Sequence, residues 1–230
     1  LFVEGIAQYR NEQQNIYQND ERVAQYAIGH TALSAWLGTN IGILGQAKVG
    51  WQEQRTDFER DIGSPLLPDA KVRFGGWAAA LALDQLNRLY FPTDGWATNL
   101  VYFDNRDDDY SRLDFGAIGA FSFASTVFNA RTSYSGAVDG NLPFYDAARI
   151  GGPLNLSAYA QGQVVGDDIT YLGLRGEQII GKFPLGLRGD LRLGVALEAA
   201  HVGRYFTETN LADLDYLNSA SIYIGSETPF

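Results

Sequence analysis

Residues 185–199 alternate between apolar and charged side chains, and this alternation limits the possible folds more than any other feature of the sequence. The large apolar side chains all stand at odd positions, together with Ala199: Leu185, Leu187, Leu191, Leu193, Val195 and Leu197. The charged side chains all stand at even positions: Arg188, Asp190, Arg192 and Glu198. Successive side chains of a strand point to opposite faces, so one face of this segment is apolar and the other is charged. On a helix the charges would scatter around the axis, so the pattern predicts a strand.

The length of this segment points to a membrane barrel. It runs for about fifteen residues, whereas strands of soluble proteins usually have about five or six. Long two-faced strands are typical of closed barrels with lipid outside and a wet lumen. The chain has 230 residues, which fits one barrel domain. We therefore predict an all-β, antiparallel transmembrane β-barrel.

Composition excludes several other classes. The sequence has no apolar run near the roughly twenty residues of a membrane helix. Its net charge of -10 would repel phosphate, so we expect no nucleic-acid partner. It has no cysteine, which excludes disulfide scaffolds and thiolate metal sites. It has neither a signal peptide nor an initiator methionine, so we expect a piece of a longer, processed protein.

About ten strands can be marked between turn signals. They cover residues 1–17, 21–37, 44–58, 72–84, 96–105, 112–123, 126–136, 169–181, 185–205 and 216–225. The connections at 59–70, 137–168 and 205–215 are long, whereas those near 124 and 183 are short. Membrane barrels have short periplasmic turns and longer outer loops, so this contrast predicts sidedness. Five aromatic residues near the short turns are expected to form an interfacial girdle: Trp36, Trp96, Phe121, Phe123 and Phe128.

Two segments resemble the bacterial surface antigen superfamily of outer-membrane barrels. Residues 83–95 resemble its turn motif through Asp84, Phe91, Pro92 and Gly95. Residues 149–159 resemble its lid loop through Arg149, Gly151, Gly152, Asn155, Ser157 and Tyr159. The superfamily includes BamA-type insertases, two-partner secretion transporters and the barrels of patatin-like phospholipase autotransporters.

The resemblance implies a sixteen-stranded barrel with a lid, here at about 137–168, folded into its lumen. Four strands would then be missing before Leu1 and two after Phe230, leaving open edges that could pair with another copy of the chain. Insertases and two-partner transporters carry arginine in the lid tip, where this chain has Ser157. That departure favours the patatin-like branch, in which a lipase domain precedes the barrel.

The lid and the inward charges form the predicted site. We expect Asn155, Ser157 and Tyr159 to hydrogen-bond a luminal network, whose members are Arg175, Glu177, Arg188, Asp190, Arg192 and Glu198. Two simpler readings stay open. The lid is an ordinary exposed loop, or the mixed charges exist for stability alone, because an unpaired charge in a narrow lumen is costly.

Other candidate chemistry is weaker. Residues 107–109 are three aspartates that could hold calcium, but a solvated loop tip is the better interpretation. His30 and His201 have no metal-binding spacing, and the sequence has no Gly-x-Ser-x-Gly elbow. We expect no catalytic residue, metal or cofactor in this segment.

The resulting hypothesis is an anchor and translocator in the bacterial outer membrane, as in patatin-like phospholipase proteins of the type V secretion kind. Its expected partners are membrane lipid, lipopolysaccharide and a passenger polypeptide, with a homo-oligomer also open. The first alternative is an insertase or two-partner secretion pore. The further alternatives are a small outer-membrane barrel enzyme and a soluble lipid-binding barrel, which would turn its apolar face inward.

Overall fold

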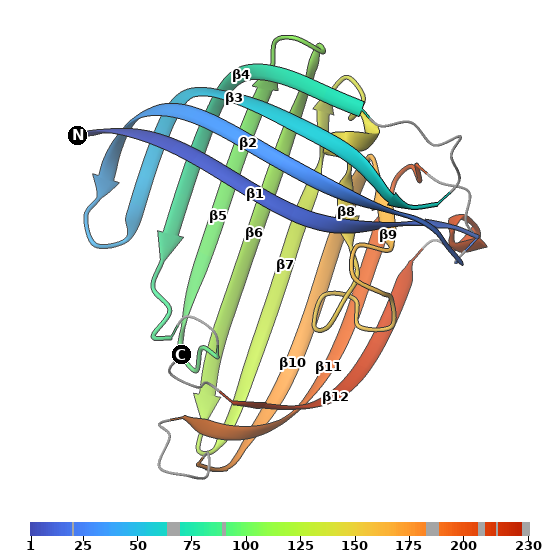
Figure 1. Ribbon diagram of the computed structural model, residues 1–230. Coiled ribbons are helices and arrows are strands. Elements are labelled where there is room, and N and C mark those ends of the chain that lie inside the picture. The colour runs from blue at the N-terminus through green and yellow to red at the C-terminus, as the bar shows by residue number, and fades with distance from the viewer. Residues whose placement is uncertain are drawn as a thin grey trace.

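Ten long strands form one antiparallel sheet in the computed structural model, which describes residues 1–19, 21–63, 70–88, 91–182, 189–206, 210–214 and 216–226. The strands are β1 (Phe2–Gln18), β2 (Glu21–Ile41), β3 (Gly45–Ile62), β4 (Ala70–Asp84), β5 (Gly95–Asn105), β6 (Tyr110–Phe123), β7 (Thr126–Asp139), β10 (Asp168–Lys182), β11 (Asp190–Val202) and β12 (Leu217–Ser226). Each pairs with the next long strand along the chain, so β1 and β12 lie at the two edges. The sheet curls strongly, and the segment between β7 and β10 lies on its concave side (Figure 1).

The ten predicted strands are confirmed, with differences at their ends. The start of the ninth predicted strand, residues 185–188, lies outside the described residues. That strand ends at Val202 rather than near Tyr205. The reason is that Tyr205 turns away to form a bridge with Gly166, which belongs to the segment between β7 and β10.

The two-faced pattern of β11 is present in the structure. Arg192, Ala196 and Glu198 are buried on the concave side, whereas Leu193 and Leu197 on the other side are 43% and 62% exposed. The same even–odd division runs through β1 to β4, with even positions facing inward. The convex face of β11 is therefore apolar and exposed, and exposed apolar side chains such as Leu33, Leu37 and Val49 occupy the same face of β2 and β3. Among the described residues, no helix is long and apolar enough to cross a membrane.

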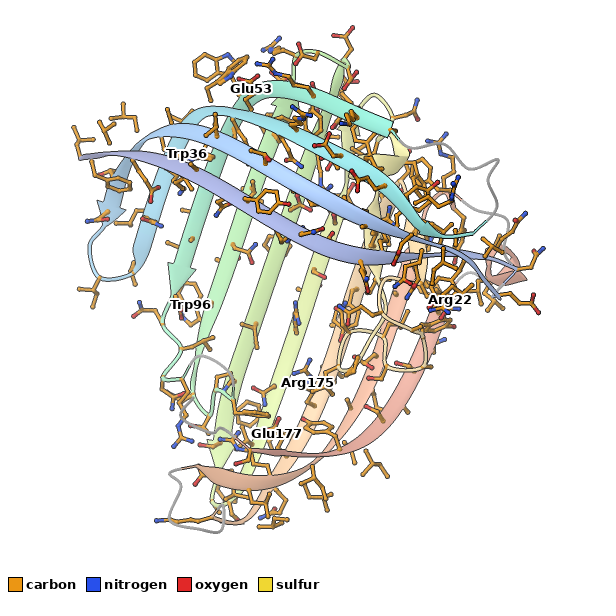
Figure 2. The ribbon with its side chains drawn as sticks, in the orientation of Figure 1. Arg22, Trp36, Glu53, Trp96, Arg175 and Glu177 are labelled. Atoms are coloured by element: carbon orange, nitrogen blue, oxygen red, sulfur yellow. The ribbon has the colours of Figure 1, made fainter. Side chains whose placement is uncertain are left out.

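Four of the five aromatic residues expected in the girdle are exposed near the short turns, and the prediction is wrong for Trp36. Trp96, Phe121, Phe123 and Phe128 are exposed near the short-turn end, the edge of the sheet where β6 turns into β7. Trp36 is only 7% exposed and faces inward, because its even position on β2 selects the concave side (Figure 2). Its indole Nε1 donates to Ser34 at 2.8 Å, and the Lys48 ammonium lies 4.7 Å from its ring centroid.

Candidate functional site: the inserted lid

The lid comprises residues 140–167, between β7 and β10. It contains the short helix η1 (Phe144–Asp146) and a small hairpin of β8 (Ala148–Ile150) and β9 (Val164–Gly166). Since β7 pairs directly with β10, the lid leaves the sheet and returns to it at one end, which we call the long-loop end. The second short helix, η2 (Asn210–Asp213), lies between β11 and β12 at that end.

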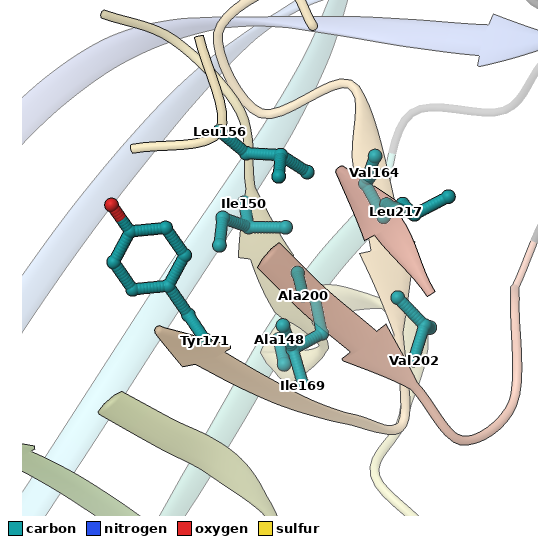
Figure 3. Packing of buried hydrophobic residues seen from close by; sticks show 9 residues of the cluster. All are labelled: Ala148, Ile150, Leu156, Val164, Ile169, Tyr171, Ala200, Val202 and Leu217. Carbon is teal, nitrogen blue, oxygen red and sulfur yellow. The ribbon is translucent and has the colours of Figure 1, made fainter. Parts of the chain in front are cut away.

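An apolar cluster seats the lid on the wall formed by β10, β11 and β12 (Figure 3). Its members are Ala148, Ile150, Leu156 and Val164 from the lid, and Ile169, Tyr171, Ala200, Val202 and Leu217 from the strands. Leu156 has no exposed surface at all. Removing this apolar surface from water favours the inserted position by the hydrophobic effect. The lid is therefore packed against the sheet and is not an ordinary exposed loop.

Glu198 of β11 holds the tip of the lid. Its carboxylate accepts hydrogen bonds from the backbone N–H of Leu156 at 3.1 Å and of Ser157 at 2.8 Å. The hydroxyls of Tyr171 and Ser219 donate to the same carboxylate, each at 2.8 Å. Hydrogen bonds to an ionised acceptor are the stronger kind, so these four bonds fix the tip firmly.

Further polar contacts surround this clamp. Arg175 of β10 donates to the Leu154 carbonyl oxygen at 2.6 Å, and the Tyr171 hydroxyl oxygen, whose proton is donated to Glu198, lies 3.3 Å from the same carbonyl oxygen. The hydroxyls of Ser157 and Ser221 lie 3.3 Å apart, which joins the lid to β12. The tip thus contacts three neighbouring strands.

Left-handed backbone shapes the tip. Gly151 and Gly152 have φ angles of 128° and 114°, which favour glycine. Leu154 and Leu156 also have positive φ angles, of 56° and 74°. Bulky residues adopt this conformation only where the surroundings impose it, and here it turns the Leu156 side chain into the apolar cluster.

A second anchor joins η1 to the neighbouring part of the sheet. Asp146 pairs with Arg112 of β6 at 2.7 Å and accepts from the Tyr110 hydroxyl at 2.8 Å. The Tyr145 hydroxyl donates to Asp108 at 2.7 Å. Burial raises the pKa of the Asp146 carboxyl, and Arg112 opposes that rise. Burial and the Asp108 carboxylate raise the pKa of the Tyr145 phenol, so it keeps its proton and donates.

Two of the predicted luminal charges face the opposite end of the sheet and not the lid. Arg192 and Glu177 form an ion pair at 2.7 Å, and the two side chains are 1% and 2% exposed. The Tyr223 hydroxyl donates to Glu177 at 2.6 Å, and Arg192 donates to the Phe91 carbonyl oxygen at 3.2 Å. Glu177 is labelled in Figure 2 well away from the lid, below Arg175.

The turn motif at 84–95 builds the segment that these charges contact. Asp84 accepts from the Leu86 backbone N–H at 2.8 Å, which fixes the first bend. Gly95 has a φ of 101°, and a Cβ there would collide with the Gln85 carbonyl oxygen. Pro92 is buried, and the adjacent Phe91 ring lies 5.4 Å from the Arg192 guanidinium. This turn therefore folds inward and packs beneath β11.

The predicted lid contacts differ in detail from those observed. Ser157 does bond to a luminal charge, but its partner is Glu198 rather than the arginines. Asn155 contributes its backbone carbonyl to Gly151 at 3.1 Å, and Tyr159 packs beside the apolar cluster. Asp190 pairs with Arg88, at 2.8 Å. These partners depend on how far each side chain extends from its strand. The alternation along a strand predicts the face to which a side chain points, but not that distance.

The remaining candidate residues either make structural contacts or lie outside the described residues. Arg188 is not among the described residues. His30 faces inward beside Thr56, at 3.1 Å, whereas His201 faces outward against the Tyr216 ring. Asp107 accepts from the Gly75 backbone N–H at 2.7 Å. No group of three or more His, Cys, Asp or Glu in the described part of the chain could hold a metal ion.

The sequence identified Glu198 as an inward charge but not as the clamp of the lid. Arg112, Asp146 and Tyr145, which form the second anchor, were not predicted at all. Arg112 stands at an inward-facing position in the alternation of β6, and this position is the one feature of the sequence that points to its role. Its partner lies 34 residues away in an irregular segment, where no periodicity applies.

Comparison with solved structures identifies the fold. The chain is similar to BamA from Haemophilus ducreyi lacking POTRA domains 1–3, with a TM-score of 0.66 and 15% sequence identity. The fold is that of a BamA-type barrel. The match covers 99% of this chain and 56% of that chain, so the chain spans about half the length of the BamA structure. No family model matches the sequence, and no curated protein matches it.

Proposed function

We propose that this chain is part of a β-barrel in the bacterial outer membrane, and that it anchors and accommodates a passenger polypeptide. Strands missing at both ends would complete sixteen. The observation that carries the proposal is the seated lid, which lies inside a curved sheet whose outer face is apolar. A lid held by side chains of the wall can gate such a lumen. The outward face would contact membrane lipid and lipopolysaccharide, and the segment itself would perform no catalysis.

We further infer that the barrel is the translocator of a patatin-like phospholipase protein. Support comes from the lid tip, where Ser157 meets Glu198 through its backbone N–H. The other branches carry an arginine at this position, which would bring a cation close to that carboxylate. The second candidate, an insertase, is favoured by the likeness to BamA. The segment encoded upstream of Leu1 separates them: a Gly-x-Ser-x-Gly lipase supports the first, and several periplasmic repeats support the second.

A lid lock tests the gating role directly. The chain has no cysteine, so Ser157→Cys with Ser221→Cys creates a single possible disulfide. Their hydroxyl oxygens are 3.3 Å apart, close enough for sulfur atoms to bond after a small adjustment. In the complete protein, oxidation should stop most passenger export, and a reductant should restore it.

The control for the lid lock is Ser221→Cys alone, which cannot form the bridge. Equal export with and without the disulfide would contradict the proposed passage past the lid. Folding assays with an unrelated barrel in liposomes provide the second arm. Accelerated folding of that barrel by this protein would replace the translocator proposal with the insertase.

A further inference from the structure

An apolar cavity of about 580 Å³ lies in the lumen at the long-loop end. Its wall contains the inward-facing side chains Ile16, Ile28, Phe58 and Val72 of β1 to β4, with Phe144 of the lid and Phe206. This volume is within the range of about 300–1,000 Å³ that is usual for small-molecule sites. Luminal faces of membrane barrels are generally polar, so an apolar chamber at this position calls for an explanation.

A smaller, polar cavity of about 330 Å³ adjoins it. The two share Gln14, Ile28 and Tyr145 in their linings, so they adjoin at these three residues. The polar cavity is lined by charged groups that include Arg149, Arg112, Glu12 and Asp146. One of the two adjoining cavities is therefore apolar and the other is ionic, which matches the two ends of an amphiphile.

Arg149 stands where the two cavities meet. Its guanidinium lies 4.9 Å from the centroid of the Phe144 ring, which lines the apolar cavity. It donates to the Phe144 carbonyl oxygen at 3.2 Å, and the Gln14 amide oxygen, turned toward it, accepts from its Nε at 2.7 Å. Both of these acceptors are uncharged.

The carboxylates around Arg149 also have other partners. Glu12 lies 3.2 Å from Arg10 and 3.4 Å from His30. Asp146 pairs with Arg112 at 2.7 Å. Burial lowers the pKa of Arg149 to about 10 and the Glu12 carboxylate only partly opposes this fall, so the side chain keeps its charge at neutral pH at a cost in desolvation. An anion placed against this guanidinium would offset that cost.

We propose that the adjoining cavities bind a single-chain anionic amphiphile, with its tail in the apolar cavity and its head at Arg149. The head is a carboxylate or a phosphate, because both accept the forked hydrogen bonds that a guanidinium offers. Binding would brace the lid against β1, since Arg149 and Phe144 belong to the lid while Gln14 and Ile16 belong to β1.

Photolabelling in nanodiscs tests this proposal. The probe is palmitate with a diazirine in its tail, and mass spectrometry maps the adducts. We expect adducts on luminal residues such as Phe58 and Phe144, besides background adducts on the outward face. Arg149→Gln should reduce the luminal adducts about tenfold and leave the outward adducts unchanged, which makes the outward face an internal standard. Arg73→Gln is the matched control, because Arg73 is exposed and pairs with Glu53 outside the lumen.

Competitors identify the head group. Palmitate and lysophosphatidylglycerol should both displace the probe, and the stronger of them distinguishes a carboxylate from a phosphate. Monopalmitin, which is uncharged, should compete at least tenfold less well. Val72→Glu, which puts a charge in the apolar cavity, should abolish the luminal adducts while Arg149 is intact. The proposal is wrong if no luminal adduct forms, if Arg149→Gln retains full labelling in a protein that folds, or if monopalmitin competes as well as palmitate.

Discussion

Glu198 holds the tip of the lid from a single position on β11. It is 4% exposed and lies in a sheet, where an unpaired carboxylate would be strongly unfavourable. Four donors satisfy it, and two of them are backbone N–H groups at the tip of the lid. The charge is thus tolerated because the lid is inserted, and the lid is held because the charge is there.

Replacing Glu198 should therefore release the lid. Glu198→Ala leaves two backbone N–H groups and two hydroxyls without their acceptor, which we expect to cost about 3 kcal/mol. The folded form should lose its resistance to SDS at a lower temperature on unheated gels. Trypsin should also cleave after Arg149 sooner. Glu53→Gln is the control, since Glu53 pairs with Arg73 on the outward face; a similar shift in both variants would show that Glu198 has no special role.

The lid as an element has two anchors with different chemistry. The tip rests on an apolar seat around Leu156, whereas η1 is fixed by hydrogen bonds from Tyr145 and to Asp146. The apolar seat depends on the exclusion of water, whereas the hydrogen bonds of η1 depend on the protonation states of Tyr145 and Asp146. They should therefore respond differently to mutation and to pH.

The apolar anchor can be weakened by one truncation. Leu156→Ala removes a fully buried side chain and should destabilise the seated lid by about 2–5 kcal/mol. Limited proteolysis at Arg149 reports the release. Leu193→Ala makes the same chemical change on the exposed face of β11 and should leave the cleavage rate unchanged. If both variants are cleaved at the rate of the unaltered protein, the seat does not hold the lid.

The polar anchor should weaken in alkali. The pKa of Tyr145 is raised above its ordinary value of 10.0, so its stabilising effect is fully present below pH 10 and is lost as the pH rises toward the raised value. Tyr145→Phe removes one hydrogen bond, for about 0.5–1 kcal/mol, and keeps the ring. The advantage of Tyr145 over phenylalanine in melting temperature should be present at pH 8 and smaller at pH 11. An advantage that grows with pH would contradict this assignment.

At the scale of the whole molecule, the two faces of the sheet meet different surroundings. The convex face carries exposed leucine, valine and aromatic side chains, while the concave face carries paired charges and the lid. This division is what a wall between hydrocarbon and water requires. A soluble barrel would turn its apolar face inward, and this arrangement is the reverse.

Spin labels along β11 test the arrangement. With the protein in liposomes, labels at Leu193 and Leu197 should be accessible to oxygen, which concentrates in hydrocarbon. A label at Ala196 should be shielded from it, since this residue is buried on the concave side. Equal oxygen accessibility at all three positions, or preferential access to a water-soluble nickel reagent at the two leucines, would rule out a lipid-facing surface.

The sequence by itself determined the strands and their faces. Alternation at a period of two is a local property, so it predicted ten strands and the burial of Arg192 and Glu198 from neighbouring residues alone. Trp36 shows which of two sequence signals prevails: its nearness to a turn favours an interfacial position, but its even position on β2 directs the side chain inward, where it is buried.

Only the tertiary structure decided which inward group meets which segment. Glu198 reaches Ser157 across 41 residues, and Arg192 reaches Phe91 across 101. These partners lie in irregular segments, whose paths depend on how far the sheet curls and where the lid settles. The meeting of Arg149, Gln14 and the apolar cavity has the same origin. Side-chain periodicity fixes a direction at each residue, whereas a contact also needs a distance, and distance is a property of the folded chain.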